Sequence, residues 1–280
     1  MMMKKISKIL ALIALSALFI PSCDIVEEPY LVPVSGGTGP GPGDNIRKVL
    51  LEDYTGQKCP NCPEAAEIAH SLKAIYGEQL VILTIHAGYY ATPDATGNFT
   101  ADYRTTEGTE LNTFFEFPAY PMGMVNRTDY SGSRILLKDS WEAATDIQTS
   151  LEPQASITIT NTYTSATRNL SCSMETDFLE TLEGTFNICV FITESGIVSP
   201  QQTDQNVNLT YVHNHVLRAS MNGTWGEMTG EDGQFIAGTT VSNSYSYILP
   251  EAWNAANCTV VAFIYNTATN KVVQAEEKGL

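Results

Sequence analysis

The residue pattern best suited to chemistry is the pair of cysteines in KCPNCP, residues 58–63. Two thiols at this spacing can close a disulfide across the start of a helix. Unpaired backbone N–H groups and the positive end of the helix dipole favour a thiolate there. Lys58 adds a nearby cation, so we expect the pKa of the Cys59 thiol to fall below its usual value. Cys59 would attack a partner's disulfide, and Cys62, deeper and less exposed to solvent, would resolve the mixed disulfide.

Two other uses of the cysteine pair remain open. A zinc site needs two further ligands, and residues 45–151 supply only His70 and His86 with no second such pair. A purely structural disulfide needs nothing more than the two thiols. His213 and His215 alternate in a strand-like segment and would share one face, but no third ligand lies near them. We therefore expect no metal and no other cofactor.

The segments around the pair alternate between strand and helix patterns. Strands are expected at 49–51, 80–85 and 122–125, and helices at 63–76, 106–115 and 134–151, from short apolar runs and from apolar residues at helical spacing. This order predicts an α/β domain with a central sheet at residues 45–151. Residues 88–104 form an insertion in that pattern, which would be either a lid over the substrate or plain surface.

Beyond Glu152-Pro153 the apolar pattern changes to a period of two residues, as in 156–160 and 170–174. Seven or eight short strands separated by turn residues predict an all-β antiparallel sandwich at 153–280. Cys172, Cys189 and Cys258 lie in apolar strand segments, and an odd number of cysteines cannot pair completely. How these three pair stays open.

The N-terminus has the features of an export signal. Lys4, Lys5 and Lys8 precede an apolar run at 9–20, which ends just before Cys23. A small residue directly before this cysteine resembles the lipobox of bacterial lipoproteins. Residues 1–22 would then be the signal peptide, Cys23 the lipid-attachment site, and 23–44 a Gly- and Pro-rich tether. The net charge of −16 argues against nucleic acid as a partner.

Three features together resemble thioredoxin-like proteins. The cysteine pair opens a helix directly after a strand, Asp53 lies six residues before Cys59, and FPAYP at 117–121 precedes a strand. The resemblance implies that Asp53 is a buried acid that takes the proton of the resolving thiol. It also implies that Pro121 is a cis-proline and that the backbone of Tyr120 pairs with a substrate strand. Glu52 could face inward in place of Asp53.

The whole layout resembles the lipoproteins related to the twenty-eight-kilodalton outer-membrane protein of anaerobic Gram-negative bacteria. The matching stretches are LLEDYTGQKCPNCPEA at 50–65, FPAYPMGMVNR at 117–127, HNHVLRA at 213–219 and VVAFIYNTATNKVVQA at 260–275. The resemblance implies a thioredoxin-like domain, a β-sandwich, and a lipid anchor in the outer membrane, on its periplasmic or its cell-surface face. We expect a thiol–disulfide oxidoreductase that acts on protein thiols or disulfides. The alternative is a non-catalytic surface protein for binding or adhesion, with a structural disulfide.

Overall fold

The computed structural model describes residues 45–230 and 235–280. The expected signal peptide, the lipid-attachment site Cys23 and the tether lie outside the described residues. The α-helices are α2 (Cys62–Tyr76), α3 (Gly88–Ala91), α4 (Thr106–Phe115) and α5 (Trp141–Thr149). The strands are β1 (Val49–Thr55), β2 (Leu80–His86), β3 (Met122–Val125), β4 (Ala155–Thr164), β5 (Asn169–Phe178), β6 (Phe186–Glu194), β7 (Ile197–Gln202), β8 (Val207–His213), β9 (Val216–Ser220), β10 (Glu227–Thr229), β11 (Thr240–Ile248), β12 (Cys258–Asn266) and β13 (Val272–Gly279).

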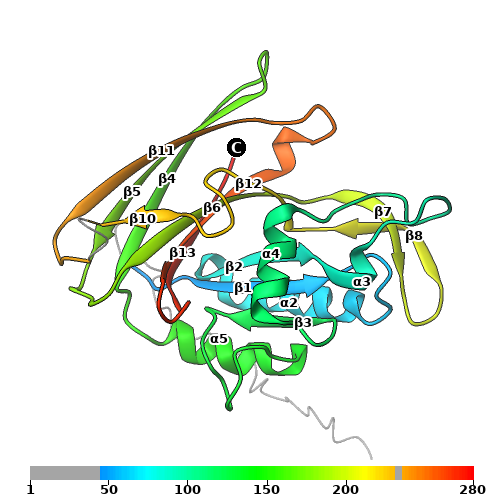
Figure 1. Cartoon of the computed structure of the whole chain (residues 1–280), viewed down its shortest axis with the longest axis horizontal. Coiled ribbons are helices and arrows are strands. Elements are labelled where there is room, and N and C mark those ends of the chain that lie inside the picture. The colour runs from blue at the N-terminus through cyan, green and yellow to red at the C-terminus, as the bar shows by residue number, and fades with distance from the viewer. Residues whose placement is uncertain (1–44, 231–234) are drawn as a thin grey trace, which may run out of the picture. The chain divides into compact units, whose positions relative to one another are not determined.

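One eight-stranded sheet runs through both halves of the sequence in the order β13-β12-β6-β9-β2-β1-β3, with β10 paired to β6 (Figure 1). β1 and β2 are parallel, and β3 runs antiparallel to β1. The halves meet where Thr84 of β2 pairs with Val216 of β9, and the Thr84 N–H donates to the carbonyl of His215 at 2.9 Å. The fold is thus a mixed α/β arrangement followed by a strand-rich part, which has no α-helix among its described residues.

A separate three-stranded antiparallel sheet, β11-β5-β4, forms a second layer in the strand-rich part (Figure 1). Alternation along β6 explains how the layers pack. Ile188, Val190 and Ile192 belong to the core shared with β4 and β5, whereas Cys189 and Phe191 belong to the core shared with α4. Because β6 is buried on both faces, it reads as a continuous apolar run in the sequence.

The helix α2 carries the cysteine pair and packs on the face of β1 and β2 opposite α4. Its apolar residues Ala65, Ala69 and Leu72 are buried in the same core as Trp141 of α5. Pro63 lies in its first turn, where a missing N–H costs little. Gly77 ends the helix with a φ of 56°. The helix begins one residue before the expected start, while α4 and β3 have the bounds expected from the sequence.

The last helix of the first half is shorter than the sequence pattern suggests. We expected a helix over 134–151, but α5 begins at Trp141. Leu136 instead pairs with Gly123, each backbone N–H donating to the other's carbonyl at 2.8–2.9 Å. Leu137, one of the apolar residues at helical spacing in 134–151, is 60% exposed. The segment before Trp141 therefore pairs with the edge of β3 and does not form the first turns of the expected helix.

Two further findings concern cysteines and membrane contact. Cys172, Cys189 and Cys258 are free and buried, and burial raises the pKa of each thiol. Each contributes to an apolar core rather than to a disulfide. Within residues 45–230 and 235–280, no helix is long and apolar enough to cross a membrane.

Candidate functional site

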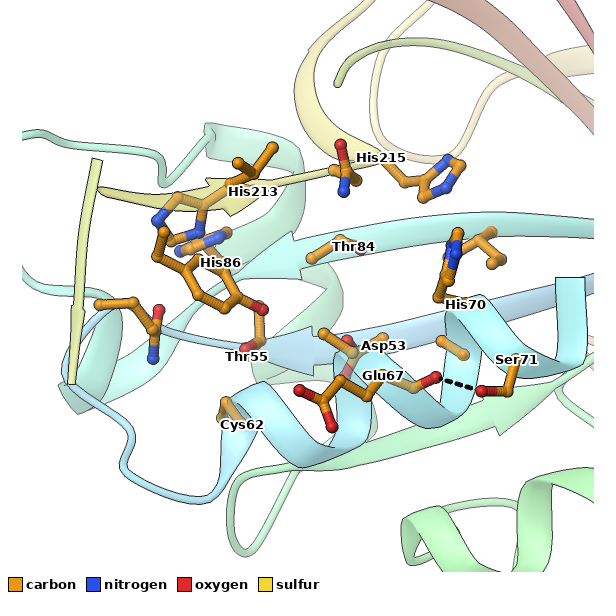
Figure 2. Close-up of a pocket in the computed structure, with 17 residues that line it drawn as sticks. Asp53, Thr55, Cys62, Glu67, His70, Ser71, Thr84, His86, His213 and His215 are labelled. Atoms are coloured by element: carbon orange, nitrogen blue, oxygen red, sulfur yellow. Dashed lines mark hydrogen bonds between the residues drawn. The ribbon is translucent and has the colours of Figure 1, made fainter. Parts of the chain in front are cut away.

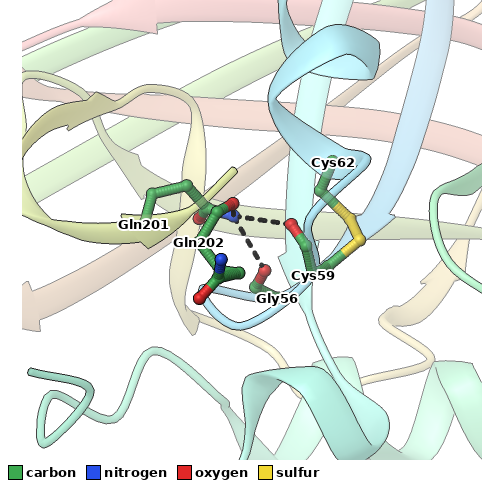
Figure 3. The surroundings of a disulfide bond; sticks show 5 residues. All are labelled: Gly56, Cys59, Cys62, Gln201 and Gln202. Atoms are coloured by element: carbon green, nitrogen blue, oxygen red, sulfur yellow. Dashed lines mark hydrogen bonds between the residues drawn. A yellow bond between two sulfur atoms is a disulfide. The ribbon is translucent and has the colours of Figure 1, made fainter. Parts of the chain in front are cut away.

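Cys59 and Cys62 form a disulfide at the start of α2, with their Cα atoms 5.4 Å apart (Figure 3). The turn that carries Cys59 follows β1 directly and is held by a bond from the Cys59 N–H to the carbonyl of Gly56 at 3.0 Å. Gly56 is needed there because a Cβ would lie 2.4 Å from the backbone of Tyr90 in α3. The inserted segment 88–104 therefore contacts the cysteine turn rather than extending away from it.

The disulfide is covered, contrary to our expectation that Cys59 is the more exposed cysteine. Cys59 is 0% exposed and Cys62 2%. The end of β7 lies beside the backbone of the cysteine turn, as Figure 3 shows: the side-chain amide of Gln201 donates to the carbonyls of Cys59 at 3.0 Å and Gly56 at 3.3 Å. The backbone N–H of Gln202 donates to the carbonyl of Gln57 at 2.8 Å. These bonds hold the backbone of the cysteine turn to the end of β7.

The ammonium group of Lys58 contacts residues other than the cysteines. Its ammonium group pairs with Asp94 at 2.8 Å and lies 5.6 Å from the ring centroid of Tyr89. Both partners belong to the inserted segment. The Asp94 carboxylate therefore offsets part of the positive charge that we expected Lys58 to supply at Cys59.

Asp53 is buried in the middle of β1, with 2% of its surface exposed. Its Oδ1 atom has no hydrogen-bond partner, and burial raises the pKa of the carboxyl from 3.8 to about 7. Asp53 and Cys62 line the same cavity. A buried carboxyl with a pKa near neutrality can accept and release a proton at physiological pH.

The neighbouring Glu52 points to the other face of β1 and is fully buried too. It makes a two-pronged ion pair with Arg127, both bonds at 2.8 Å and both side chains 0% exposed. Burial disfavours the charge of Arg127, but the Glu52 carboxylate outweighs it and raises the guanidinium pKa. Arg127 also lies 4.9 Å from the ring of Phe263 in β12. Arg127 thus connects Glu52 of the first half to a ring of the second half. Sequence analysis did not identify the pair because Arg127 follows β3 without any charge pattern.

The Tyr120–Pro121 peptide bond is cis. Pro121 directly precedes Met122, which pairs with Tyr54 near the end of β1. The loop therefore lies at the edge of the sheet where the cysteine turn begins. The Tyr120 hydroxyl donates to Asn112 of α4 at 2.5 Å, which fixes the side chain and leaves the backbone at this edge.

A cavity of about 540 Å³ opens beside α2 and extends from Cys62 and Asp53 to the β8–β9 turn (Figure 2). His213 ends β8 and His215 lies in the turn with a φ of 56°, so the two do not share one strand face as expected. His213 packs instead against His86, with ring centroids 5.5 Å apart. Within the described part of the chain, no group of three His, Cys, Asp or Glu side chains is arranged to hold a metal ion.

Comparison with known proteins assigns the family. The model of the outer membrane protein Omp28 family matches residues 109–280, more than half of the chain. The chain belongs to the Omp28 family. No curated protein matches it. The match covers most of α4, β3, α5 and the strand-rich part, whereas the cysteine pair lies outside it.

Solved structures from Porphyromonas gingivalis resemble the chain. HBP35 is 15% identical with a TM-score of 0.62, over 85% of this chain and 76% of HBP35, which shows a shared fold. A domain of the outer membrane lipoprotein Omp28 is 22% identical with a TM-score of 0.32, over 46% of this chain and 88% of that domain.

Proposed function

We propose that this Omp28-family protein is a thiol–disulfide oxidoreductase with a thioredoxin-like first half, acting on protein thiols or disulfides. The observation that carries the proposal is the combination of a disulfide at the start of α2 with a fully buried Asp53 whose pKa lies near 7. Burying a carboxyl without a hydrogen-bond partner is costly, and a role in proton transfer accounts for it. The parallel β1–β2 pair and the cis Tyr120–Pro121 bond before β3 support the same assignment.

The exchange proceeds in two steps from the reduced pair. The Cys59 thiolate attacks one sulfur of a partner's disulfide, and the partner's other sulfur leaves as a thiolate and takes a proton from solvent. Asp53 then takes the proton of the Cys62 thiol, and the Cys62 sulfur attacks Cys59. The second partner sulfur leaves, so the Cys59–Cys62 disulfide forms while the partner's disulfide becomes two thiols. The same steps run in reverse oxidise a dithiol.

The partner would dock along the backbone of Tyr120 beside Pro121. Gln201 donates to the Cys59 carbonyl, so it restrains the backbone of the cysteine turn during exchange. Trapping tests the proposal: the Cys62→Ser variant cannot resolve a mixed disulfide, so partner proteins should stay bound to Cys59 until a reductant releases them. The Cys59→Ser/Cys62→Ser variant is the matched control. Equal recovery from both variants would contradict exchange at Cys59.

A second function is favoured by one observation, the complete burial of Cys59. A non-catalytic surface protein for binding or adhesion would use the disulfide only to hold the start of α2 to the turn after β1. Such a protein would yield no trapped partner, and its disulfide would be reduced only under conditions that unfold the chain.

The family places the protein among outer membrane proteins, and we propose that a lipid on Cys23 attaches it there. The apolar run before Cys23 and the Gly- and Pro-rich stretch after it support this anchor. The Cys23→Ser variant should appear in the soluble fraction, whereas Cys172→Ser, which alters a buried free thiol, should stay with membranes. A Cys23→Ser protein that still sediments fully with membranes would contradict the anchor.

A further inference from the structure

The cavity beside α2 is lined by acidic side chains and by neither lysine nor arginine. Asp53 and Glu67 carry the carboxylates. Burial lowers the pKa of His86 to about 3 and that of His213 to about 4, so both imidazoles are neutral at pH 7. Burial also lowers the pKa of His215. The inner wall therefore presents negative charge and neutral polar groups, in a chain whose net charge is −16.

Three buried polar atoms on this wall have no hydrogen-bond partner: Asp53 Oδ1, His86 Nδ1 and His213 Nε2. Their side chains are between 95% and 98% buried. Native proteins rarely leave such groups unpaired, because each loses its bonds to water on folding. An apolar occupant would leave all three unpaired, and an anion would be repelled by the carboxylates. An occupant with N–H donors and a positive charge suits the wall.

Tyr211 lies near enough to both carboxylates to be affected by their charges. Burial raises the pKa of its hydroxyl to about 12, and the charges of Asp53 and Glu67 raise it as well, so all three side chains lie within electrostatic reach of one another. Its ring offers a face that attracts cations. Asp53 on β1 and Glu67 on α2 both line the cavity, and Glu67 is exposed (Figure 2).

We propose that this cavity binds a small organic cation, an aliphatic amine whose ammonium groups are held by Asp53 and Glu67. Its volume of about 540 Å³ suits a small molecule, since pockets for such ligands span roughly 300–1,000 Å³. The site goes beyond the thiol exchange and does not depend on it, because amine binding requires neither cysteine to react. A diamine matches the two carboxylates in charge.

The affinity should depend on pH through Asp53. The residues that line the cavity together with Asp53 include Cys62, Glu67 and His70 on α2, Thr84 and His86 on β2, and Tyr211, His213 and His215 from the β8–β9 region, and Gly123 of β3 pairs with the Asp53 backbone. Of these, His86 and His213 titrate well below pH 6 and Tyr211 well above pH 8. With a pKa of about 7, Asp53 is about 10% ionised at pH 6 and about 90% at pH 8. Amine affinity should rise about nine-fold between these pH values.

Calorimetric titration of the oxidised full chain tests the site with three probes of similar length: putrescine, 1,4-butanediol and succinate. We expect putrescine to bind and the other two to show no binding. Asp53→Asn should weaken putrescine binding and abolish its pH dependence, and Glu67→Gln should weaken it with the pH dependence kept. Glu64→Gln is the matched control, since Glu64 is an exposed acid on the same helix that does not line the cavity.

Two further variants separate the cavity from general attraction to an acidic surface. Ala66→Leu places a larger side chain at the cavity wall without changing charge and should weaken binding. His70→Gln should leave the pH dependence in place, which assigns it to Asp53. Equal binding of succinate or butanediol, equal loss in Glu64→Gln and Glu67→Gln, or no putrescine binding at millimolar concentration would each overturn the proposal.

Discussion

Replacing Asp53 by asparagine should stabilise the folded protein, and the gain should depend on pH. In the folded chain, burial raises the pKa of Asp53 from 3.8 to about 7. Between these values the unfolded chain ionises the carboxyl while the folded chain keeps its proton. Stability is therefore lost as pH rises through this window, at about 1.4 kcal/mol per pH unit.

Above pH 7 the buried Asp53 lowers the free energy of unfolding of the parent protein by roughly 4 kcal/mol, and below about pH 4 it lowers it very little. Asparagine has nearly the shape of aspartic acid but no charge, so the variant should recover most of this energy at pH 8. At pH 4 it should nearly match the parent, because the folded Asp53 is neutral there and the unfolded carboxyl is only about half ionised.

Urea unfolding of the oxidised protein at pH 4, 5.5, 7 and 8.5 measures the difference. Asp94→Asn is the control, because Asp94 pairs with Lys58 at the surface and such a pair is worth about 1 kcal/mol or less. A stability gain that is the same at all four pH values, or a loss at pH 8.5, would refute the claim that burial raises the Asp53 pKa.

Three more predictions follow from buried contacts. Arg127→Met should destabilise the protein by about 3–5 kcal/mol in urea unfolding, because it leaves the charge of Glu52 buried alone, and Glu52→Leu added to it should restore much of that loss. Gln201→Leu should speed reduction of the disulfide by dithiothreitol, measured by thiol release, whereas Gln202→Ala, whose side chain bonds only to Thr203 and Asn206, should not. Between pH 7 and pH 4, the free energy of unfolding of His213→Gln should fall by about 3 kcal/mol less than that of the parent. The reason is that the folded chain keeps this imidazole neutral while the unfolded chain protonates it below pH 6.5. Equal acid sensitivity of both proteins would contradict this.

Local patterns predicted the elements whose structure is decided locally. The apolar spacing of α4 and the short run of β3 gave their bounds, because each buries one stripe or one strand against its neighbours. The same spacing misled at 134–140, where Leu136 pairs with Gly123 across a turn. The spacing of apolar residues gives no sign that a segment can instead pair with the edge of a sheet.

The contacts that shape the site are distant in the sequence and left no such pattern. The Gln201 side chain bonds to the Cys59 carbonyl from 142 residues away, and Thr84 pairs with Val216 in a single pairing that makes one sheet of the two halves. The acids Glu52 and Asp53 both turned out to be buried, on opposite faces of β1, where sequence analysis treated them as alternatives. Alternation predicted that His213 and His215 share one strand face, but His215 lies in the turn with a φ of 56°.

The most direct test of the central claim is the catalysed reduction of insulin by dithiothreitol, followed by turbidity. The account predicts that the protein accelerates the reaction above dithiothreitol alone, that Cys59→Ser abolishes the acceleration, and that Asp53→Asn slows it most where Asp53 would be ionised, above pH 7. A protein whose Cys59–Cys62 disulfide is reduced under these conditions, yet which leaves insulin reduction at the rate of dithiothreitol alone, would contradict thiol exchange as its function.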